Sequence, residues 1–327
     1  MSLVLLHPTA LPSGPADPDR TARPGPGHRA MIRHLAQIRH LDQPGAAAQV
    51  LDRLRRLPAA PEGMTFGAAD PGGAAYDRFF GVSRTSTGQG VFQHSVLVAY
   101  RSLLEEGFSY GTRLSWAEWS SLCTALQTML ADPIGDGAGS LPIPEPRLLR
   151  WHLDPDRRWR VGHHVFFVLT QSLIVALNGL SSACDMGRPE EGRSALRLAA
   201  RLLDASAAAF VFTAEFSSTQ YQHRVRPSME PPSVPAGFSG LLSPDHQHLV
   251  RMFARLRPVL RELPAGLSEE HRSLTRALET TYESHKYVCG RFGGDRSASL
   301  RMSDTTDVCA VEVIDRLKLA RTRAVRT

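Results

Sequence analysis

Residues 281–290 read TYESHKYVCG and place a histidine, His285, one helical turn before a cysteine, Cys289, near the end of a predicted helix. On an α-helix this spacing stacks the two side chains on one face. A neutral imidazole is a good metal ligand. With this spacing, His285 can coordinate a metal while Cys289 reaches a second atom of the same bound group.

Three interpretations of this pair follow from the residues alone. A heme fits the spacing, because the imidazole would bind the iron and the thiol would form a thioether with a vinyl group. A structural zinc ion would need two further ligands, and no second paired spacing clearly supplies them. The third interpretation is an ordinary buried cysteine beside a histidine on the polar face, since the HxxxC spacing is common.

Length and composition indicate a helical globular protein. The chain has 327 residues, enough for one large domain or two modest ones with a substantial core. Hydrophobic residues make up 42% of the chain and charged residues 21%, which are ordinary values for a soluble globular protein. Stretches rich in Ala, Leu, Arg and Glu dominate and strand signals are scarce, so we predict an all-α fold.

Charge and cysteine spacing exclude several classes of protein. The net charge of +6 is scattered along the predicted helices, and its densest patch, residues 316–326, is interpreted as a solvated or frayed end. The cysteines show no CxxC or CxxCH spacing, and the apolar run Met1–Leu6 is too short for a signal peptide. We therefore expect no nucleic-acid partner, no disulfide framework and a cytoplasmic location.

We predict two parts in the chain: a flexible arm over residues 1–27, rich in Pro, Gly and Ala, and one helical domain over residues 28–327. Residues 226–240 contain so many prolines that irregular structure is expected there. Residues 161–184 are uncharged and long enough to cross a membrane, but their His, Gln, Asn and Ser residues predict a central buried helix and no membrane partner. Further helices are predicted at 29–57, 91–107, 115–131, 194–216, 268–290 and from Ser243 onward.

Three blocks carry a resemblance to a known family: RRWRVGHHVFFVLTQ (157–171), QYQHRVRPSMEPP (220–232) with SGLLSPDH (239–246), and TYESHKYVCGRFGGDRSASL (281–300). Together they resemble the heme-dependent L-tyrosine and 3-methyl-L-tyrosine hydroxylases of bacterial natural-product pathways. These enzymes belong to the heme-dependent aromatic oxygenases, with tryptophan and indoleamine dioxygenases. The resemblance covers about residues 75–320 and implies a single helical domain of the dioxygenase type.

The resemblance also implies a covalently attached heme. His285 matches the family's axial iron ligand, and Cys289 matches the cysteine that forms the thioether. His246 matches a catalytic distal histidine, which would handle the protons of peroxide and of the phenol as a general acid or base. The residues alone instead favour a partly exposed histidine in the first turn of a helix that Ser243 caps.

Three further residues are candidate substrate contacts. Arg226 can bind a substrate carboxylate or a heme propionate with its guanidinium, or form an ordinary surface ion pair. Tyr221 can stack on an aromatic substrate or pack in the core. His163 and His164 diverge by about 100° on a helix, so only one of them can face a given cavity, and we assign His163 to it. The alternative for either residue is a buried histidine with its hydrogen bonds satisfied.

The activity implied by the resemblance is hydroxylation of the phenol ring of L-tyrosine or 3-methyl-L-tyrosine, ortho to its hydroxyl, to give a catechol. Hydrogen peroxide is the expected oxidant, and dioxygen with a reductant is the other route. The alternatives are a heme dioxygenase that opens an indole ring, a non-catalytic heme sensor or carrier, and a helical interaction protein without heme. We also expect a homo-oligomer.

Overall fold

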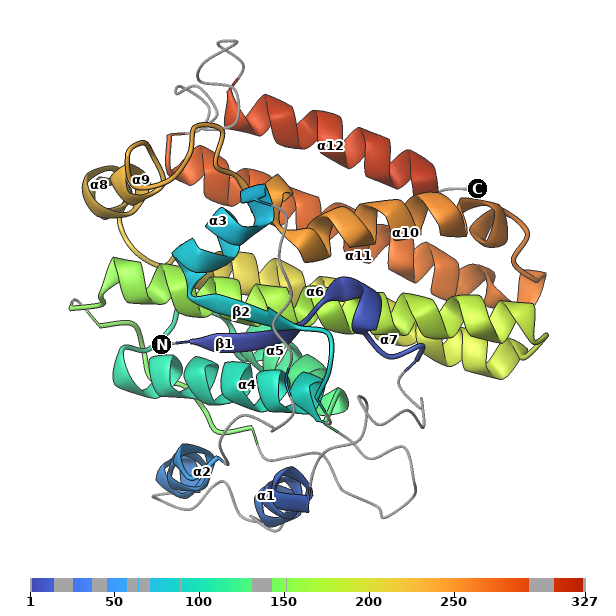
Figure 1. Cartoon of the computed structure of the whole chain (residues 1–327), viewed down its shortest axis with the longest axis horizontal. Coiled ribbons are helices and arrows are strands. Elements are labelled where there is room, and N and C mark those ends of the chain that lie inside the picture. The colour runs from blue at the N-terminus through green and yellow to red at the C-terminus, as the bar shows by residue number, and fades with distance from the viewer. Residues whose placement is uncertain are drawn as a thin grey trace.

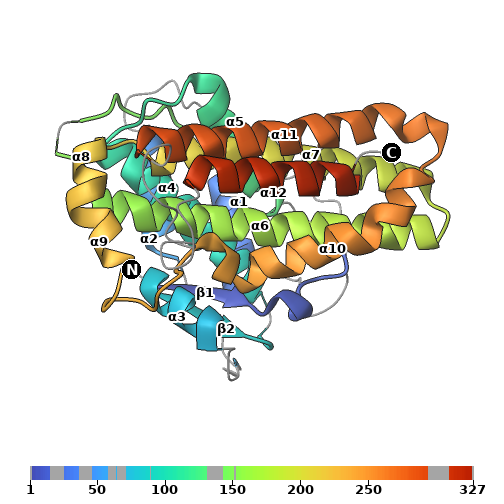
Figure 2. The ribbon, with the colours of Figure 1, turned by 90° about the horizontal axis from the view of Figure 1, so that it is seen from above.

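Five helices of the described chain close into a ring. The computed structural model describes residues 2–14, 26–36, 46–57, 64, 71–88, 90–130, 143–150, 152–293 and 309–325. Within these ranges each helix of the ring packs against the next, and the last packs against the first (Figures 1 and 2). In ring order they are α6 (Pro155–Asp185), α7 (Pro189–Thr213), α11 (Ser268–Arg291), α12 (Ala310–Val325) and α10 (Pro244–Arg261).

The longest of these helices, α6, is the centre of the fold. Asp154 caps it by accepting a hydrogen bond from the backbone N–H of Asp156, and Pro155 takes the first helical position. By length and composition α6 is apolar enough to cross a membrane, but 72% of its apolar window is buried within the protein. The prediction of a central buried helix over residues 161–184 is therefore confirmed.

The helices α6 and α7 approach closely at Gly162. A Cβ atom added to Gly162 would lie 2.0 Å from Oγ1 and 2.6 Å from Cβ of Thr213. The Thr213 hydroxyl donates a 2.6 Å hydrogen bond to the carbonyl of Ala209, which holds the side chain in place. Glycine is thus required at residue 162 by the distance between the two helices.

Further helices cover the side of α6 and α7 that faces away from the ring. α4 (Val91–Ser109) packs on α6 and α5 (Trp116–Thr128) packs on α7. Ser115 and Glu118 form the predicted capping box of α5. The single helix predicted within residues 29–57 is wrong: the structure has α1 (Pro26–Ala36) and α2 (Ala46–Arg55), and the Pro-Gly pair of the sequence between them disfavours a continuous helix.

The N-terminal segment belongs to the core. β1 (Leu3–Leu6) pairs in parallel with β2 (Val82–Thr85), which follows α3 (Pro71–Phe80), and a short 3₁₀ helix covers Pro8–Ala10. Leu3, Leu5 and Leu6 are fully buried. The prediction of a flexible arm is therefore wrong for residues 2–14, because the apolar run pairs with a strand far along the chain. Residues 1 and 15–25 of the predicted arm lie outside the described residues, and residues 26 and 27 begin α1.

The arginine-rich C-terminal segment is also ordered. Residues 310–325 form α12, which packs on α11 and α10, so the prediction of a frayed end from residue 316 is wrong over this range. Ile314 is buried, and Lys286 Nζ lies 3.0 Å from Asp315 Oδ1. The high arginine content drew attention away from the apolar face of this helix, which packs on α11 and α10. Residues 326 and 327 lie outside the described residues.

A short irregular segment connects α7 to α10. It contains α8 (Ser218–Gln220), a π-helical turn (Tyr221–Val225), α9 (Arg226–Ser228) and a 3₁₀ turn (Gly240–Leu242). Apart from the single turn of α9, the prediction of irregular structure over residues 226–240 is confirmed. The 3₁₀ turn Ala265–Leu267 joins α10 to α11. Together with the helices named above, these elements confirm the predicted all-α class. The short β1–β2 pair is an addition that was not predicted.

The contact between α6 and α7 gives a direct test of the packing. We expect Gly162→Ala to lower the free energy of unfolding by about 1–3 kcal/mol, because the added methyl group overlaps Thr213. Gly192→Ala, on α7, is the matched control, since its Cβ would meet no atom closer than 3.8 Å and alanine favours a helix by about 1 kcal/mol. Urea denaturation measures both. Equal effects of the two substitutions would contradict the close approach at Gly162.

A buried histidine pair gives a second test. His28 Nε2 on α1 lies 2.9 Å from His94 Nδ1 on α4, and both side chains are buried. Burial, with the positive neighbours His28 and Arg101, lowers the pKa of His94 to about 4. The unfolded chain then binds more protons than the folded one below about pH 6.5, so stability is complete above that pH and falls as the pH drops.

We expect His94→Gln, which keeps hydrogen-bonding atoms but does not titrate, to remove part of this acid sensitivity. The loss of unfolding free energy between pH 7.5 and pH 5.0 should be smaller in the variant by about 1.5–2 kcal/mol. Denaturant titrations at the two pH values measure the difference. An unchanged pH dependence would show that His94 is not held neutral by the fold.

Candidate active site

The ring of helices encloses a cavity of about 320 Å³. Aromatic and aliphatic side chains form most of its wall, and all five helices of the ring contribute to it. The three sequence blocks 157–171, 220–246 and 281–300 therefore converge on one space. All six candidate residues line it: His163, Tyr221, Arg226, His246, His285 and Cys289.

The α11 helix presents His285 and Cys289 to the cavity from successive turns, as the spacing predicts. The ring of Phe210 on α7 stacks on the His285 imidazole at 4.5 Å with an angle of 9° between the planes, and this fixes the orientation of the imidazole. Burial, together with the neighbouring His246, lowers the pKa of His285 to about 4. At neutral pH the imidazole is therefore neutral, which is the form that binds a metal.

Cys289 is half-buried and free of disulfides. Burial raises the pKa of its thiol to about 12, so the group is protonated at neutral pH. A protonated thiol is a poor ligand for a metal ion, because metals bind the thiolate. In this environment Cys289 suits a bond to carbon better than a bond to a metal.

His246 lies in the first turn of α10, where the Ser243 side chain accepts a hydrogen bond from its backbone N–H. Its Nε2 atom is buried and has no hydrogen-bond partner among the described residues. Burial, with the positive charge of Arg321, lowers its pKa to about 4. A neutral imidazole nitrogen without a partner, at a cavity wall, is available to accept a proton or to bind a group within the cavity.

The residue before His246 anchors this turn to the rest of the fold. The Asp245 carboxylate accepts hydrogen bonds from Arg84 Nη1 and Nη2, at 3.0 and 2.7 Å, and from Gln171 Nε2 at 2.9 Å. Arg84 also pairs with Asp77 at 2.7 Å, and these charged side chains are almost fully buried. The ion pairs hold the start of α10, and with it His246, against β2, α3 and α6.

His163 and His164 diverge, as the helix geometry predicts. His163 faces the cavity between Phe80, stacked at 4.3 Å, and Trp159 at 4.5 Å, and its Nδ1 lies 2.7 Å from the carbonyl of Trp159. His164 is fully buried on the other side, with Nε2 2.6 Å from the carbonyl of Phe80. Burial lowers the pKa of His163 to about 3, so it lines the wall as a neutral aromatic group.

Tyr221 and Arg226 flank the π-helical turn at one end of the cavity. One face of Tyr221 is covered by Phe292, which stacks on it at 4.2 Å with the planes 4° apart. Arg226 Nε donates a 2.9 Å hydrogen bond to Glu230 Oε1. Both residues line the cavity, but each already has a partner within the protein.

The charges of the wall are unbalanced. Two arginines, Arg226 and Arg321, line the cavity, whereas the described lining residues include no aspartate or glutamate. In addition, no three His, Cys, Asp or Glu side chains of the described ranges form a cluster that could hold a metal ion. The zinc interpretation of His285 and Cys289 therefore gains no support within these ranges. A single imidazole suits a metal whose remaining ligands come from a bound macrocycle.

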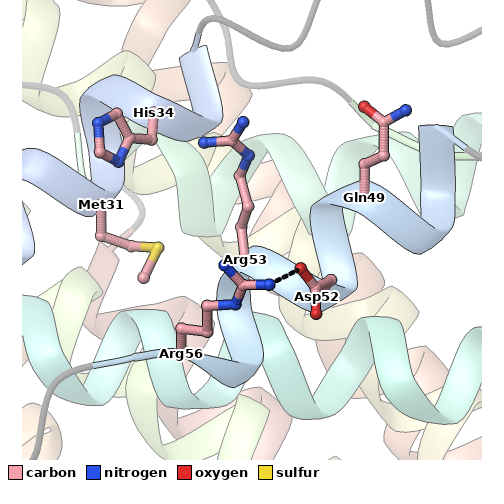
Figure 3. Close-up of a pocket in the computed structure, with 6 residues that line it drawn as sticks. All are labelled: Met31, His34, Gln49, Asp52, Arg53 and Arg56. Carbon is pink, nitrogen blue, oxygen red and sulfur yellow. Dashed lines mark hydrogen bonds and ion pairs between the residues drawn. The ribbon is translucent and has the colours of Figure 1, made fainter.

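A second hollow lies away from these residues, between α1 and α2. Its volume is about 380 Å³, and five of its six lining residues are polar or charged. Figure 3 shows His34 and Arg53 beside it, and Arg56 paired with Asp52 at 2.7 Å. This hollow contains none of the candidate residues and is not connected with their chemistry.

Several cavity residues were not predicted from the sequence. Arg321 and Ile314 come from α12, which was interpreted as a frayed end, although the apolar spacing of residues 310–317 signals a helix. Phe210 and Tyr282 lie on predicted helices, but nothing in the sequence distinguishes them from core residues. Arg84, which lies outside the cavity wall, was also not predicted, because its partner Asp245 is 161 residues away in the chain.

Comparisons with known proteins agree with this geometry. The family model described as SfmD 3-methyl-L-tyrosine peroxygenase matches residues 4–280, so the N-terminal segment lies within the family's shared region and not outside it. The matched range ends before His285. A 3-methyl-L-tyrosine peroxygenase of Streptomyces lavendulae is 30% identical over 299 residues, which covers 87% of this chain and 82% of the relative.

A solved structure is also similar. It is a crystal structure of reduced SfmD, obtained by soaking with sodium hydrosulfite, and it aligns with a TM-score of 0.67 at 28% sequence identity. The alignment covers 89% of this chain and 98% of the solved chain. The helical architecture described above is therefore the architecture of that protein.

Proposed function

The chain belongs to the SfmD 3-methyl-L-tyrosine peroxygenase family and is thus a homologue of an oxidoreductase, and from this premise we propose that it is a heme enzyme. In this proposal it uses hydrogen peroxide to hydroxylate the ring of a tyrosine-like amino acid in natural-product biosynthesis. One observation carries the proposal. His285, Cys289 and His246, from two helices, line one enclosed apolar cavity. Its action in the cytoplasm and as a homo-oligomer stays a prediction.

The residues present fit a heme. His285 offers a neutral imidazole that Phe210 orients, and the described ranges contain no cluster of further metal ligands near it. Cys289, one turn away, offers a protonated thiol, which can add its sulfur and hydrogen across the double bond of a vinyl group to give a thioether. The apolar wall would bury the faces of the macrocycle. Arg226 and Arg321 match its anionic propionates in charge.

The heme would supply the activation of peroxide, and the protein would supply orientation and proton transfer. The overall reaction converts a ring C–H bond and hydrogen peroxide into a ring C–OH bond and water. His246 Nε2, neutral and without a partner, would accept a proton from peroxide and return it to the departing water. Asp245 and Arg84 would keep this nitrogen directed at the cavity.

The cavity wall suits an aromatic substrate. Tyr76, Phe80, Phe167 and Phe238 form one packed aromatic cluster, with ring centroids 5.0–6.3 Å apart, that lines the cavity next to His163. Such a cluster holds a phenol ring by apolar contact and excludes water from it. We propose 3-methyl-L-tyrosine as the substrate, the amino acid in the description of the matching family, with L-tyrosine as the second choice.

The thioether predicts a change in mass. We expect the denatured wild-type protein to carry the added mass of one heme, and Cys289→Ser to show the bare polypeptide mass while its heme becomes extractable by acid-acetone. Cys184→Ser is the matched control, because Cys184 is also half-buried but does not line the cavity. Intact-protein mass spectrometry measures all three. Covalent heme that persists in Cys289→Ser would rule out this cysteine as the attachment point.

The role of His246 predicts a loss of rate. We expect His246→Ala to retain heme and to lower the rate of hydroxylation by about 10²–10⁴-fold, the range for loss of a general acid or base. His248→Ala, two residues further along α10 and outside the cavity wall, is the control. Product formation from 3-methyl-L-tyrosine and peroxide, followed by chromatography, gives the rates. Near-normal turnover in His246→Ala would remove this residue from the mechanism.

A further inference from the structure

Arg321 is the one cavity arginine for which the described residues provide no acidic partner. It lies on α12, is half-buried and lines the cavity. Its Nε atom is buried and has no hydrogen-bond partner within the described ranges, and none of the ion pairs formed there includes Arg321. By contrast, Arg226 pairs with Glu230 at 2.9 Å, and Arg316 on α12 pairs with Glu312 at 2.6 Å.

Two ion pairs between α12 and α11 fix the position of Arg321. Asp315 pairs with Lys286 at 3.0 Å, and Lys318 pairs with Glu283. The two helices are therefore antiparallel, and the next turn of α12 brings Arg321 beside Tyr282, one turn before His285. Burial raises the pKa of Tyr282 and the adjacent Arg321 opposes that rise. Arg321 also lowers the pKa of His246, so it lies near that histidine as well as near Tyr282.

A guanidinium without an anion is unfavourable in such a place. Burial of Arg321 Nε withdraws part of this charge from water, which is unfavourable unless an opposite charge compensates it. The described lining residues provide no carboxylate, and the three cavity histidines are neutral. Among the described residues no carboxylate balances this charge, and an anionic ligand in the cavity would do so.

We propose that Arg321 binds a carboxylate of the cavity's ligand through its guanidinium. This proposal rests on the proposed function for the identity of that ligand, which has two sources of the same chemistry: the α-carboxylate of the amino acid substrate and a propionate of the heme. Arginine suits either, because its planar N–H groups match both oxygens of a carboxylate. Arg321 is thus a ligand-binding residue outside the three sequence blocks. It also lies outside the family match, which ends at residue 280.

The experiment compares two probes that differ only in the carboxylate. Isothermal titration calorimetry of the purified holoprotein gives the Kd for 3-methyl-L-tyrosine and for 3-methyltyramine, which lacks the carboxylate. If the amino acid is the source, Arg321→Gln raises the Kd for 3-methyl-L-tyrosine about 10- to 100-fold and leaves that for 3-methyltyramine within about twofold. Arg321→Lys, which keeps the charge, recovers part of the loss. Arg323→Gln, an exposed residue of the same helix, is the matched control.

The second arm tests the heme as the source. In a Cys289→Ser background, where no thioether retains the cofactor, the rate of heme transfer to apomyoglobin reports how firmly the protein holds it. If a propionate is the partner, Arg321→Gln accelerates the transfer about 10-fold or more over Arg323→Gln, and both small-molecule Kd values stay unchanged.

Failure of this proposal is distinct from failure of the proposed function. If Arg321→Gln behaves like Arg323→Gln in both arms, Arg321 binds no carboxylate, whatever the turnover of the enzyme. If the protein forms no catechol but Arg321→Gln still weakens one of the two carboxylate ligands selectively, the reaction assignment fails and the carboxylate site stands.

Discussion

The buried guanidinium of Arg84 joins the parts of the chain on which the cavity depends. From β2 it pairs with Asp77 of α3 and Asp245 of α10, while Gln171 of α6 bonds both Asp245 and the carbonyl of Leu6 in β1. The two aspartates raise the pKa of Arg84 even though burial alone would lower it, so the side chain stays charged. Removal of Arg84 would leave two buried carboxylates without their cation, at a cost of about 3–5 kcal/mol. The network therefore fixes the first turn of α10, which contains His246.

This network also explains which parts of the fold the sequence predicts. Capping and periodicity are local, and they identify α5, α6, α10 and α11 from the residues of each segment. The β1–β2 pairing joins residues separated by most of the first hundred positions and depends on a partner strand that no local window contains. A short apolar run next to many prolines therefore has the appearance of a loose arm, although its leucines are fully buried.

The candidate site divides in the same way. His285 and Cys289 share one helix, so their spacing alone predicts their common face, and the helix start at Ser243 predicts where His246 lies. That these residues converge with His163 could be predicted only from the family resemblance of the separate sequence blocks, because tertiary packing determines this convergence. Arg321 was missed because the arginines of α12 conceal an apolar face, formed by Val313, Ile314 and Leu317. The arginine-rich composition of α12 reflects its exposed side, whereas the spacing of its apolar residues reveals its buried side.

The order of the helices around the ring explains why two histidines line the cavity from different helices. α10 and α11 are consecutive in the chain, yet α12 lies between them in the ring. Two consecutive antiparallel helices in direct contact would fill the space between their facing side chains. With α12 inserted, His246 and His285 instead approach a shared space from different helices, and each remains close enough that His246 lowers the pKa of His285. Since burial also keeps both imidazoles neutral, one can bind a metal while the other is free to exchange protons. The C-terminal helix α12 thus separates the two helices that carry these histidines, and it is also the source of Arg321.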